Sequence, residues 1–226
     1  MALEAKTRPL LLGHRGCRLP GYGENSISAF SHAIESGCDG FEFDVRASQD
    51  GHLVCVHDAR LGRQIIDSST YEQLCNNHLK CGLARLEDVL RQFGESAFLD
   101  IELKVTGIES DVAELFRRFR PKRLVVSSFL PEVVSRFAEL AADVPVGLIF
   151  EDLSGLRVWP NLPVQYVMPH RELVTPQLVS SAQEANVRVL AWTVNRPEEM
   201  RRLAAMGLDG VISDDPGLLY KTLCAR

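Results

Sequence analysis

Short apolar runs of strand length alternate with helix-period segments along almost the whole chain, and this alternation restricts the possible folds more than any other feature. The apolar runs lie at residues 10–12, 40–46, 53–57, 97–104, 124–129, 146–150, 165–168, 187–194 and 210–213. The helical segments lie at residues 26–36, 86–93, 109–119, 131–142, 176–185, 197–205 and 216–223. Repeated strand–helix units of this kind predict a parallel sheet with helices outside it.

The number of units and the chain length favour a closed barrel. About eight units within ~250 residues is the size of a TIM-type (β/α)8 barrel, and the chain has 226 residues. The alternative is a doubly wound open sheet. However, the first strand is followed by Gly13-His14-Arg15-Gly16 rather than by the GxGxxG turn of dinucleotide-binding folds. We therefore predict an α/β fold, a TIM-type (β/α)8 barrel, with residues 1–226 forming one domain.

Composition and charge exclude several kinds of partner. The formal net charge is −5 and the basic residues are scattered, so there is no basic surface for nucleic acid. Residues 1–9 lack the apolar core of a signal peptide, and no apolar run approaches the ~20 residues that span a bilayer. The six cysteines contain no CxxC pair. We expect a cytoplasmic protein with reduced thiols and no stable membrane insertion.

Two of the predicted strands, 40–46 and 97–104, carry a charged side chain at every second position. These charged residues are Glu42, Asp44, Arg46, Asp100, Glu102 and Lys104. Because strand side chains alternate between faces, the charges share one face of each strand. An antiparallel sheet could turn that face to water. In a parallel barrel the outer face is covered by helices, so the charged face must point into the barrel.

Carboxylates inside a barrel persist only when they are paired or bound to a metal. Glu42, Asp44 and Glu102 would meet at the C-terminal mouth of such a barrel as three oxygen ligands. Oxygen ligands favour Mg²⁺ or Ca²⁺, whereas zinc would usually recruit histidine or cysteine. The alternative is a set of salt bridges to Arg46 and Lys104 without any metal.

Two histidines each follow a predicted strand: His14 after residues 10–12 and His57 at the end of residues 53–57. A single histidine is more often a packing residue than a catalyst. Two of them at equivalent strand ends, on either side of the acidic strand, favour acid–base chemistry at the rim where barrel enzymes react. Arg15 adjoins His14, and its planar guanidinium group suits a phosphate.

An ordered series of short motifs resembles the glycerophosphodiester phosphodiesterase family. The motifs are His14-Arg15-Gly16, Glu24-Asn25-Ser26, Glu42-Phe43-Asp44, Asp50-Gly51, His57-Asp58, Ile101-Glu102-Leu103-Lys104, Ala191-Trp192-Thr193-Val194-Asn195 and Ser213-Asp214-Asp215-Pro216. Each one alone is weak, but their combination in this order is specific and extends from His14 to Pro216.

The resemblance implies a barrel of the phosphoinositide-phospholipase-like kind that hydrolyses small glycerophosphodiesters to glycerol phosphate and an alcohol. It implies a divalent cation, Mg²⁺ or Ca²⁺. The implied roles are metal binding for Glu42, Asp44 and Glu102, acid–base catalysis for His14 and His57, and substrate binding for Arg15, Lys104 and Trp192.

The chain departs from the family pattern in two places. Gly23 and Ser26 flank Glu24-Asn25 where the family usually has Pro-Glu-Asn-Thr, and residues 61–65 replace a usual arginine-threonine-threonine run. The second departure borders the expected mouth and therefore affects substrate preference. Glu24 and Asn25 are either residues at the start of a helix or supports of the site.

Several readings of function and of the rim stay open on sequence alone. A related phosphodiesterase would act on lysophospholipid or a sugar phosphodiester, although the polar segment 59–85 offers no long apolar lid for a lipid tail. A barrel that has lost catalysis would only bind a phosphorylated ligand. Phe129, Met168, His170 and Trp192 follow later strands, where they either pack in the core or line the space for the leaving alcohol.

Overall fold

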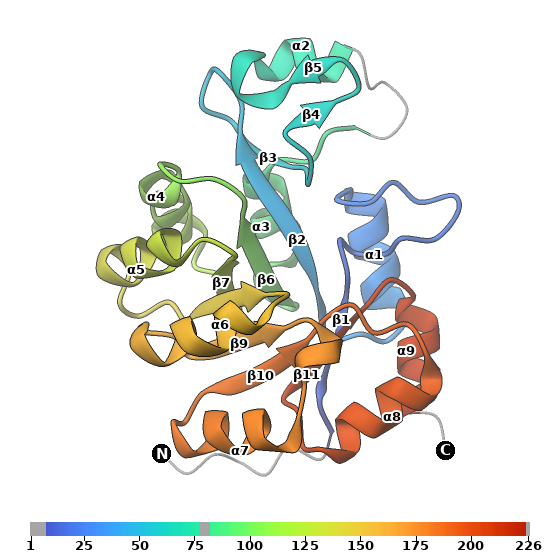
Figure 1. Cartoon of the computed structure of the whole chain (residues 1–226). Coiled ribbons are helices and arrows are strands. Elements are labelled where there is room, and N and C mark those ends of the chain that lie inside the picture. The colour runs from blue at the N-terminus through green and yellow to red at the C-terminus, as the bar shows by residue number, and fades with distance from the viewer. Residues whose placement is uncertain (1–7, 77–81, 225–226) are drawn as a thin grey trace.

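Eight parallel strands close into a barrel in the computed structural model, which describes residues 8–76 and 82–224 (Figure 1). The barrel strands are β1 (Leu10–Gly13), β2 (Gly40–Ala47), β6 (Phe98–Leu103), β7 (Arg123–Ser128), β8 (Val146–Phe150), β9 (Tyr166–Pro169), β10 (Arg188–Ala191) and β11 (Gly210–Ser213). β1 pairs with β11 on one side and with β2 on the other, which closes the sheet. The predicted barrel is confirmed, and the open-sheet alternative is excluded.

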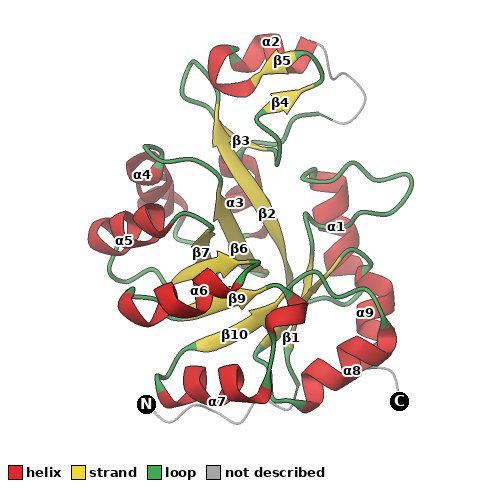
Figure 2. Ribbon diagram, viewed as in Figure 1, coloured by secondary structure: helices red, strands yellow, loops and turns green. Residues whose placement is uncertain are grey.

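Helices surround the barrel and connect its strands (Figure 2). They are α1 (Ile27–Glu35), α2 (Tyr71–Asn76), α3 (Leu86–Phe93), α4 (Glu109–Phe119), α5 (Pro131–Leu140), α6 (Leu153–Val158), α7 (Pro176–Glu184), α8 (Pro197–Ala205) and α9 (Pro216–Leu223), with short 3-10 turns at Ile66–Ser68, Trp159–Asn161 and Arg171–Leu173. Proline occupies the first turn of several of these helices, where its missing N–H costs no hydrogen bond. None of the described helices combines the length and apolar character that a membrane crossing requires.

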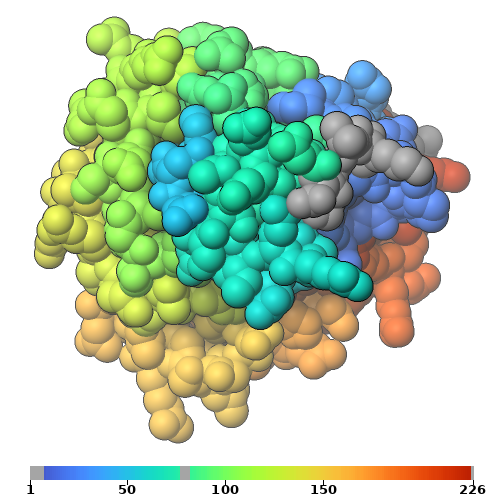
Figure 3. All heavy atoms as spheres, turned by 90° about the horizontal axis from the view of Figure 1, so that it is seen from above, coloured from blue at the N-terminus to red at the C-terminus, as the bar shows by residue number. Residues whose placement is uncertain are grey.

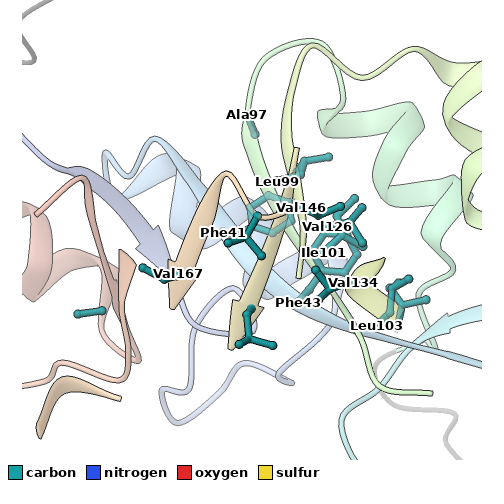
Figure 4. Close-up of a cluster of buried hydrophobic side chains, with 14 of the residues drawn as sticks. Phe41, Phe43, Ala97, Leu99, Ile101, Leu103, Val126, Val134, Val146 and Val167 are labelled. Carbon is teal, nitrogen blue, oxygen red and sulfur yellow. The ribbon is translucent and has the colours of Figure 1, made fainter. Parts of the chain in front are cut away.

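The apolar face of β2 and β6 points outward and packs under the helices. Phe30 of α1 stacks on Phe41 with ring centroids 4.4 Å apart, and Phe93 of α3 meets the same ring edge-on at 5.1 Å. Figure 4 shows the outward-facing side chains of these strands gathered in one cluster. Because this face is covered by helices, the alternate charged positions point into the barrel, as the sequence pattern predicts.

The barrel interior is apolar elsewhere. A second cluster of buried side chains comes from the inward positions of the other strands and from the first residue of β6, Phe98. It comprises Leu10, Leu12, Phe98, Val125, Ile149, Tyr166, Met168, Leu190 and Ile212. Polar groups are therefore concentrated where β2 and β6 end, and the interior beneath and beside them is a packed core rather than a pore.

One excursion interrupts the regular strand–helix order. β3 (Leu53–Cys55) runs antiparallel to β2, and β4 (Arg60–Leu61) pairs with β5 (Gln64–Ile65) before α2. This segment projects beyond the end of β2 in Figure 1, and its atoms lie in front when the molecule is viewed from above in Figure 3. The expectation that His57 ends a strand equivalent to β1 is wrong: β3 is not a barrel strand, and it runs back toward the mouth.

Candidate active site

Three buried carboxylates converge where β2 and β6 lie side by side. Asp44 is paired in register with Glu102, and Glu42 with Asp100. Glu42, Asp44 and Glu102 are 4%, 1% and 6% exposed, and one oxygen from each lies within 4.8 Å of the other two. The parallel register therefore brings together the three acids that the sequence pattern selects.

Two cations partly neutralise this cluster. Arg15 Nε lies 3.3 Å from Asp44 Oδ2, and Lys104 forms an ion pair with Glu102. Burial alone would raise the pKa of Asp44, but Lys104 and Arg15 outweigh it and lower that pKa below its usual value. Arg46 does not join them, because its Nε donates to the His57 carbonyl oxygen at 2.8 Å. Of the two predicted salt-bridge partners, only Lys104 meets the carboxylates.

The compensation is incomplete at two oxygens. Glu42 Oε2 accepts the backbone N–H of Arg15 at 2.8 Å, but Glu42 Oε1 is buried without a hydrogen-bond partner among the described residues. Asp44 Oδ1 also lacks one within residues 8–76 and 82–224; Lys104 Nζ lies 3.3 Å away without hydrogen-bond geometry. Burial and the neighbouring Asp44 charge raise the pKa of Glu42 well above its usual value. Three carboxylates facing two cations, with unpartnered oxygens between them, fit a divalent cation with oxygen ligands.

Asn25 and Glu24 support the charged groups. Asn25 Nδ2 donates to Asp44 Oδ2 at 2.8 Å, and its Oδ1 accepts the backbone N–H of Asp44 at 3.1 Å. Glu24 accepts from Arg15 Nη1 at 2.6 Å. The helix cap is instead Ser26, whose side chain accepts the backbone N–H of Ala29. Of the two open readings, the structure favours support of the site over helix capping for both residues.

The two histidines line the same cavity as Glu42 and Glu102 and come from different segments, one after β1 and the other after β3. His14 Nδ1 donates to Asp214 Oδ1 at 2.7 Å, and its Nε2 lies 3.9 Å from Glu42 Oε2. His57 Nδ1 donates to Asp58 Oδ1 at 2.7 Å. Partial burial lowers the pKa of His57, so its ring is neutral at pH 7. His57 reaches the mouth through the returning strand β3, not through a barrel strand.

One cavity of about 350 Å³ unites these groups. Its charged side is lined by His14, Arg15, Glu42, His57, Asp100, Glu102 and Lys104, and the rest by Phe129, Ile149, Glu151, Met168, Trp192 and Ile212. A larger hollow of about 970 Å³ opens where the strands begin, at the other end of the barrel, and none of the predicted site residues lines it. The smaller cavity is therefore the candidate site, because the predicted catalytic and binding side chains line it.

The rim residues divide into lining and packing groups. The Trp192 indole N–H donates to the Met168 carbonyl oxygen at 2.8 Å, and its ring meets Phe129 edge-on at 5.4 Å. Both rings line the cavity. Met168 does so as well but is fully buried, so it belongs to the core and the cavity floor together. His170 does not line it; its Nε2 accepts from Arg171 at 3.1 Å.

Two site residues were missed in the sequence. Asp214 holds the Nδ1 of His14 and is itself held by Asn195 Nδ2 at 2.6 Å. Its position directly after a predicted strand was the available signal. Asp100 is fully buried and accepts from Ser127 Oγ at 2.6 Å through one oxygen; its other oxygen has no partner in the part of the chain that the structure describes. Its place in the charged face of strand 97–104 was visible, but not its lack of a cation.

A parallel barrel whose mouth combines clustered carboxylates, imidazoles and fixed cations has the groups that a hydrolase of phosphoric diesters needs. The model of the glycerophosphoryl diester phosphodiesterase family matches residues 14–218. The chain belongs to this family and is a phosphodiesterase.

Individual relatives agree with this assignment along nearly the full chain. A probable glycerophosphodiester phosphodiesterase 1 from Mycobacterium tuberculosis is 47% identical, over 92% of this chain and 90% of that protein. The structure of a glycerophosphodiester phosphodiesterase from Parabacteroides distasonis superimposes with a TM-score of 0.84 at 26% identity, covering 96% and 97% of the two chains. An Oleispira antarctica phosphodiesterase, solved in complex with the product sn-glycerol-3-phosphate, shares the fold with a TM-score of 0.81 at 23% identity, covering 95% and 96%.

Proposed function

We propose that this chain, as a single catalytic barrel domain, hydrolyses glycerophosphodiesters to glycerol 3-phosphate and an alcohol with the help of a divalent cation. The observation that carries the proposal is the one cavity lined by two imidazoles, two fixed cations and two carboxylates of the cluster, Glu42 and Glu102, with the buried Asp44 within 4.8 Å of both. The names of the relatives and the product bound by the Oleispira protein support the same substrate class.

Glu42, Asp44 and Glu102 are the residues proposed to hold the cation, Mg²⁺ or Ca²⁺. When bound, it would supply positive charge to the phosphate oxygens and stabilise the charge that builds up in the transition state. Arg15 and Lys104 bind the phosphate from the protein side. Arg15 suits this role because its buried Nε has no hydrogen-bond partner among the described residues, although Asp44 lies nearby.

His57 is proposed as the general base and His14 as the general acid. A neutral imidazole accepts a proton, and the lowered pKa of His57 keeps its ring in that form at pH 7. The proton would come from the nucleophile, which is water or the glycerol hydroxyl beside the phosphate. In the second case a cyclic phosphate forms and is then opened by water. Asp214 occupies Nδ1 of His14, so Nε2 is the nitrogen left to protonate the leaving alcohol.

A product assay tests the proposal. Purified protein is incubated with glycerophosphocholine, glycerophosphoethanolamine or glycerophosphoglycerol, with lysophosphatidylcholine as the rival substrate. Glycerol 3-phosphate is measured for the three glycerophosphodiesters and free choline for lysophosphatidylcholine, with and without chelator. We expect release from the glycerophosphodiesters that chelation abolishes and Mg²⁺ or Ca²⁺ restores. Activity indifferent to chelation would remove the cation from the proposal, and release of product from lysophosphatidylcholine alone would replace the substrate class.

The same assay tests the two histidines. His14→Ala and His57→Ala should each lower kcat by about 100-fold or more, since a positioned acid or base contributes about that much. Circular dichroism spectra should match the unmodified protein. Rates close to those of the unmodified protein in both variants would remove the acid–base scheme.

A further inference from the structure

The half of the cavity away from the carboxylate cluster is apolar apart from one acid. Its lining residues are Phe129, Ile149, Glu151, Met168, Trp192 and Ile212. The proposed function places the phosphate between Arg15, Lys104 and the cluster. A group attached to the phosphate must then extend into this second half, because the two halves form one continuous cavity.

Two aromatic rings form a corner in this half. The Phe129 and Trp192 rings are nearly perpendicular, at 88°, with centroids 5.4 Å apart. The hydrogen bond from the Trp192 indole to the Met168 carbonyl oxygen fixes the orientation of that ring. Lys104 Nζ already lies over Phe129, 5.5 Å from its centroid. The face of an indole is the strongest aromatic partner for a cation, and aromatic faces recognise quaternary ammonium groups in particular.

Glu151 gives this half its negative charge. It follows β8 directly. β9 lies between β8 and β10, and His170 at the end of β9 contacts both neighbours: its backbone N–H donates to the Phe150 carbonyl oxygen at 2.8 Å, and it bridges to Trp192. Among the described residues no hydrogen bond or ion pair involves the Glu151 side chain. The other acids of the cavity belong to the carboxylate cluster or, like Asp100, lie fully buried beneath it.

The nearby lysine does not cancel this negative charge. Lys104 is paired with Glu102 and lies 3.3 Å from Asp44, so its charge is balanced within the cluster. Glu151 is also exposed at the rim, where an incoming group can reach it without a desolvation cost for the carboxylate. A carboxylate without a cationic partner beside a fixed indole face is complementary to a positively charged group.

We propose that Glu151, together with Trp192, makes this enzyme selective for glycerophosphodiesters whose alcohol carries an ammonium or quaternary ammonium group. The inference rests on the proposed function, because it assigns the alcohol side of the same cavity. Neutral alcohols such as glycerol fit the space but gain no attraction from Glu151.

The test compares cationic with neutral substrates on the cation-loaded enzyme. kcat/KM is measured for glycerophosphocholine and glycerophosphoethanolamine and, as the neutral substrate, glycerophosphoglycerol. Glu151→Gln should reduce the cationic-to-neutral ratio of kcat/KM by about five-fold, the size of an attraction at a partly solvated site. Glu151→Lys should reduce it further, by about 20-fold in all. High salt should weaken the preference of the unmodified enzyme, since the group is exposed to solvent.

Glu139→Gln is the matched control, because it removes one exposed acid from α5 outside the cavity and should leave the ratio unchanged. A ratio unaltered in both Glu151 variants, including the case in which all substrates slow down equally, would overturn the inference while leaving the proposed function in place. If the unmodified enzyme cleaves none of the three substrates, the proposed function is overturned instead.

Discussion

At the residue scale, the proposed acid depends on a contact between the two ends of the chain. Asp214 is 25% exposed in its side chain and fixes His14 through Nδ1. Asp214→Asn keeps a side chain of similar size but removes the negative charge that balances a protonated His14 ring, so kcat should fall by at least about 10-fold. Asp58→Asn is the comparison. The Asp58 side chain is 78% exposed and contacts His57 from the solvent side. We expect a loss below about five-fold there. Equal effects of the two variants on kcat would contradict this account.

Asp100 gives a prediction for stability. Burial raises its pKa to about 7 against a model-compound value of 3.8. The folded state therefore binds a proton more tightly than the unfolded state, so the free energy of unfolding falls as pH rises from about 4 to 7. Asp100→Asn removes this loss and keeps an acceptor for Ser127. In chelator-treated protein, the free energy of unfolding of the variant, relative to that of the unmodified protein, should rise by about 2–4 kcal/mol between pH 4 and pH 8.

Urea unfolding at several pH values measures that gain. The difference between the two proteins should grow with pH across this window and level off above it. A difference that stays constant from pH 4 to pH 8 would show that the pKa of Asp100 is not higher in the folded state than in the unfolded state.

At the element scale, the pairing of β2 with β6 leaves room only for glycine at the first residue of β2. A Cβ placed on Gly40 would lie 1.8 Å from the Phe98 carbonyl oxygen, a backbone atom of β6 that cannot move alone. Gly40→Ala should destabilise the protein by about 3 kcal/mol through overpacking. Gly217→Ala is the control, because it lies in α9 with its nearest atom at 3.6 Å. It should stabilise by about 0.5 kcal/mol through helix propensity. Thermal unfolding that ranks the two variants the other way would contradict this packing argument.

Most elements could be predicted because local periodicity decides them. α3, α4, α8 and α9 have the bounds that the apolar pattern indicates. The direction of β3 was not predicted, because the short apolar run at residues 53–57 shows that a strand forms but not with which neighbour or in which sense it pairs. That pairing depends on tertiary contacts with β2. The same limit applies to β10, which ends at Ala191 rather than at residue 194.

At the scale of the whole molecule, barrel closure explains which parts of the site were predictable. Glu42, Asp44 and Glu102 come from strands whose alternation is visible in the sequence, and parallel register brings them together. The Asp214–His14 contact joins residues 200 positions apart and exists only because β11 pairs with β1. Such a contact has no local signature. Lys104 meets the carboxylates and Arg46 does not, although the alternation places both on the charged face. This difference is likewise set by the packing of the mouth.

The central claim is that Glu42, Asp44 and Glu102 bind a divalent cation, and calorimetric titration of metal-free protein with Mg²⁺ and with Ca²⁺ tests it most directly. We expect about one cation bound per chain in the unmodified protein and in Glu139→Gln, and a loss of at least about 10-fold in affinity in Glu42→Gln and Glu102→Gln. Absence of binding for both ions in the unmodified protein would contradict it. So would an affinity in the Glu42 and Glu102 variants equal to that of the unmodified protein.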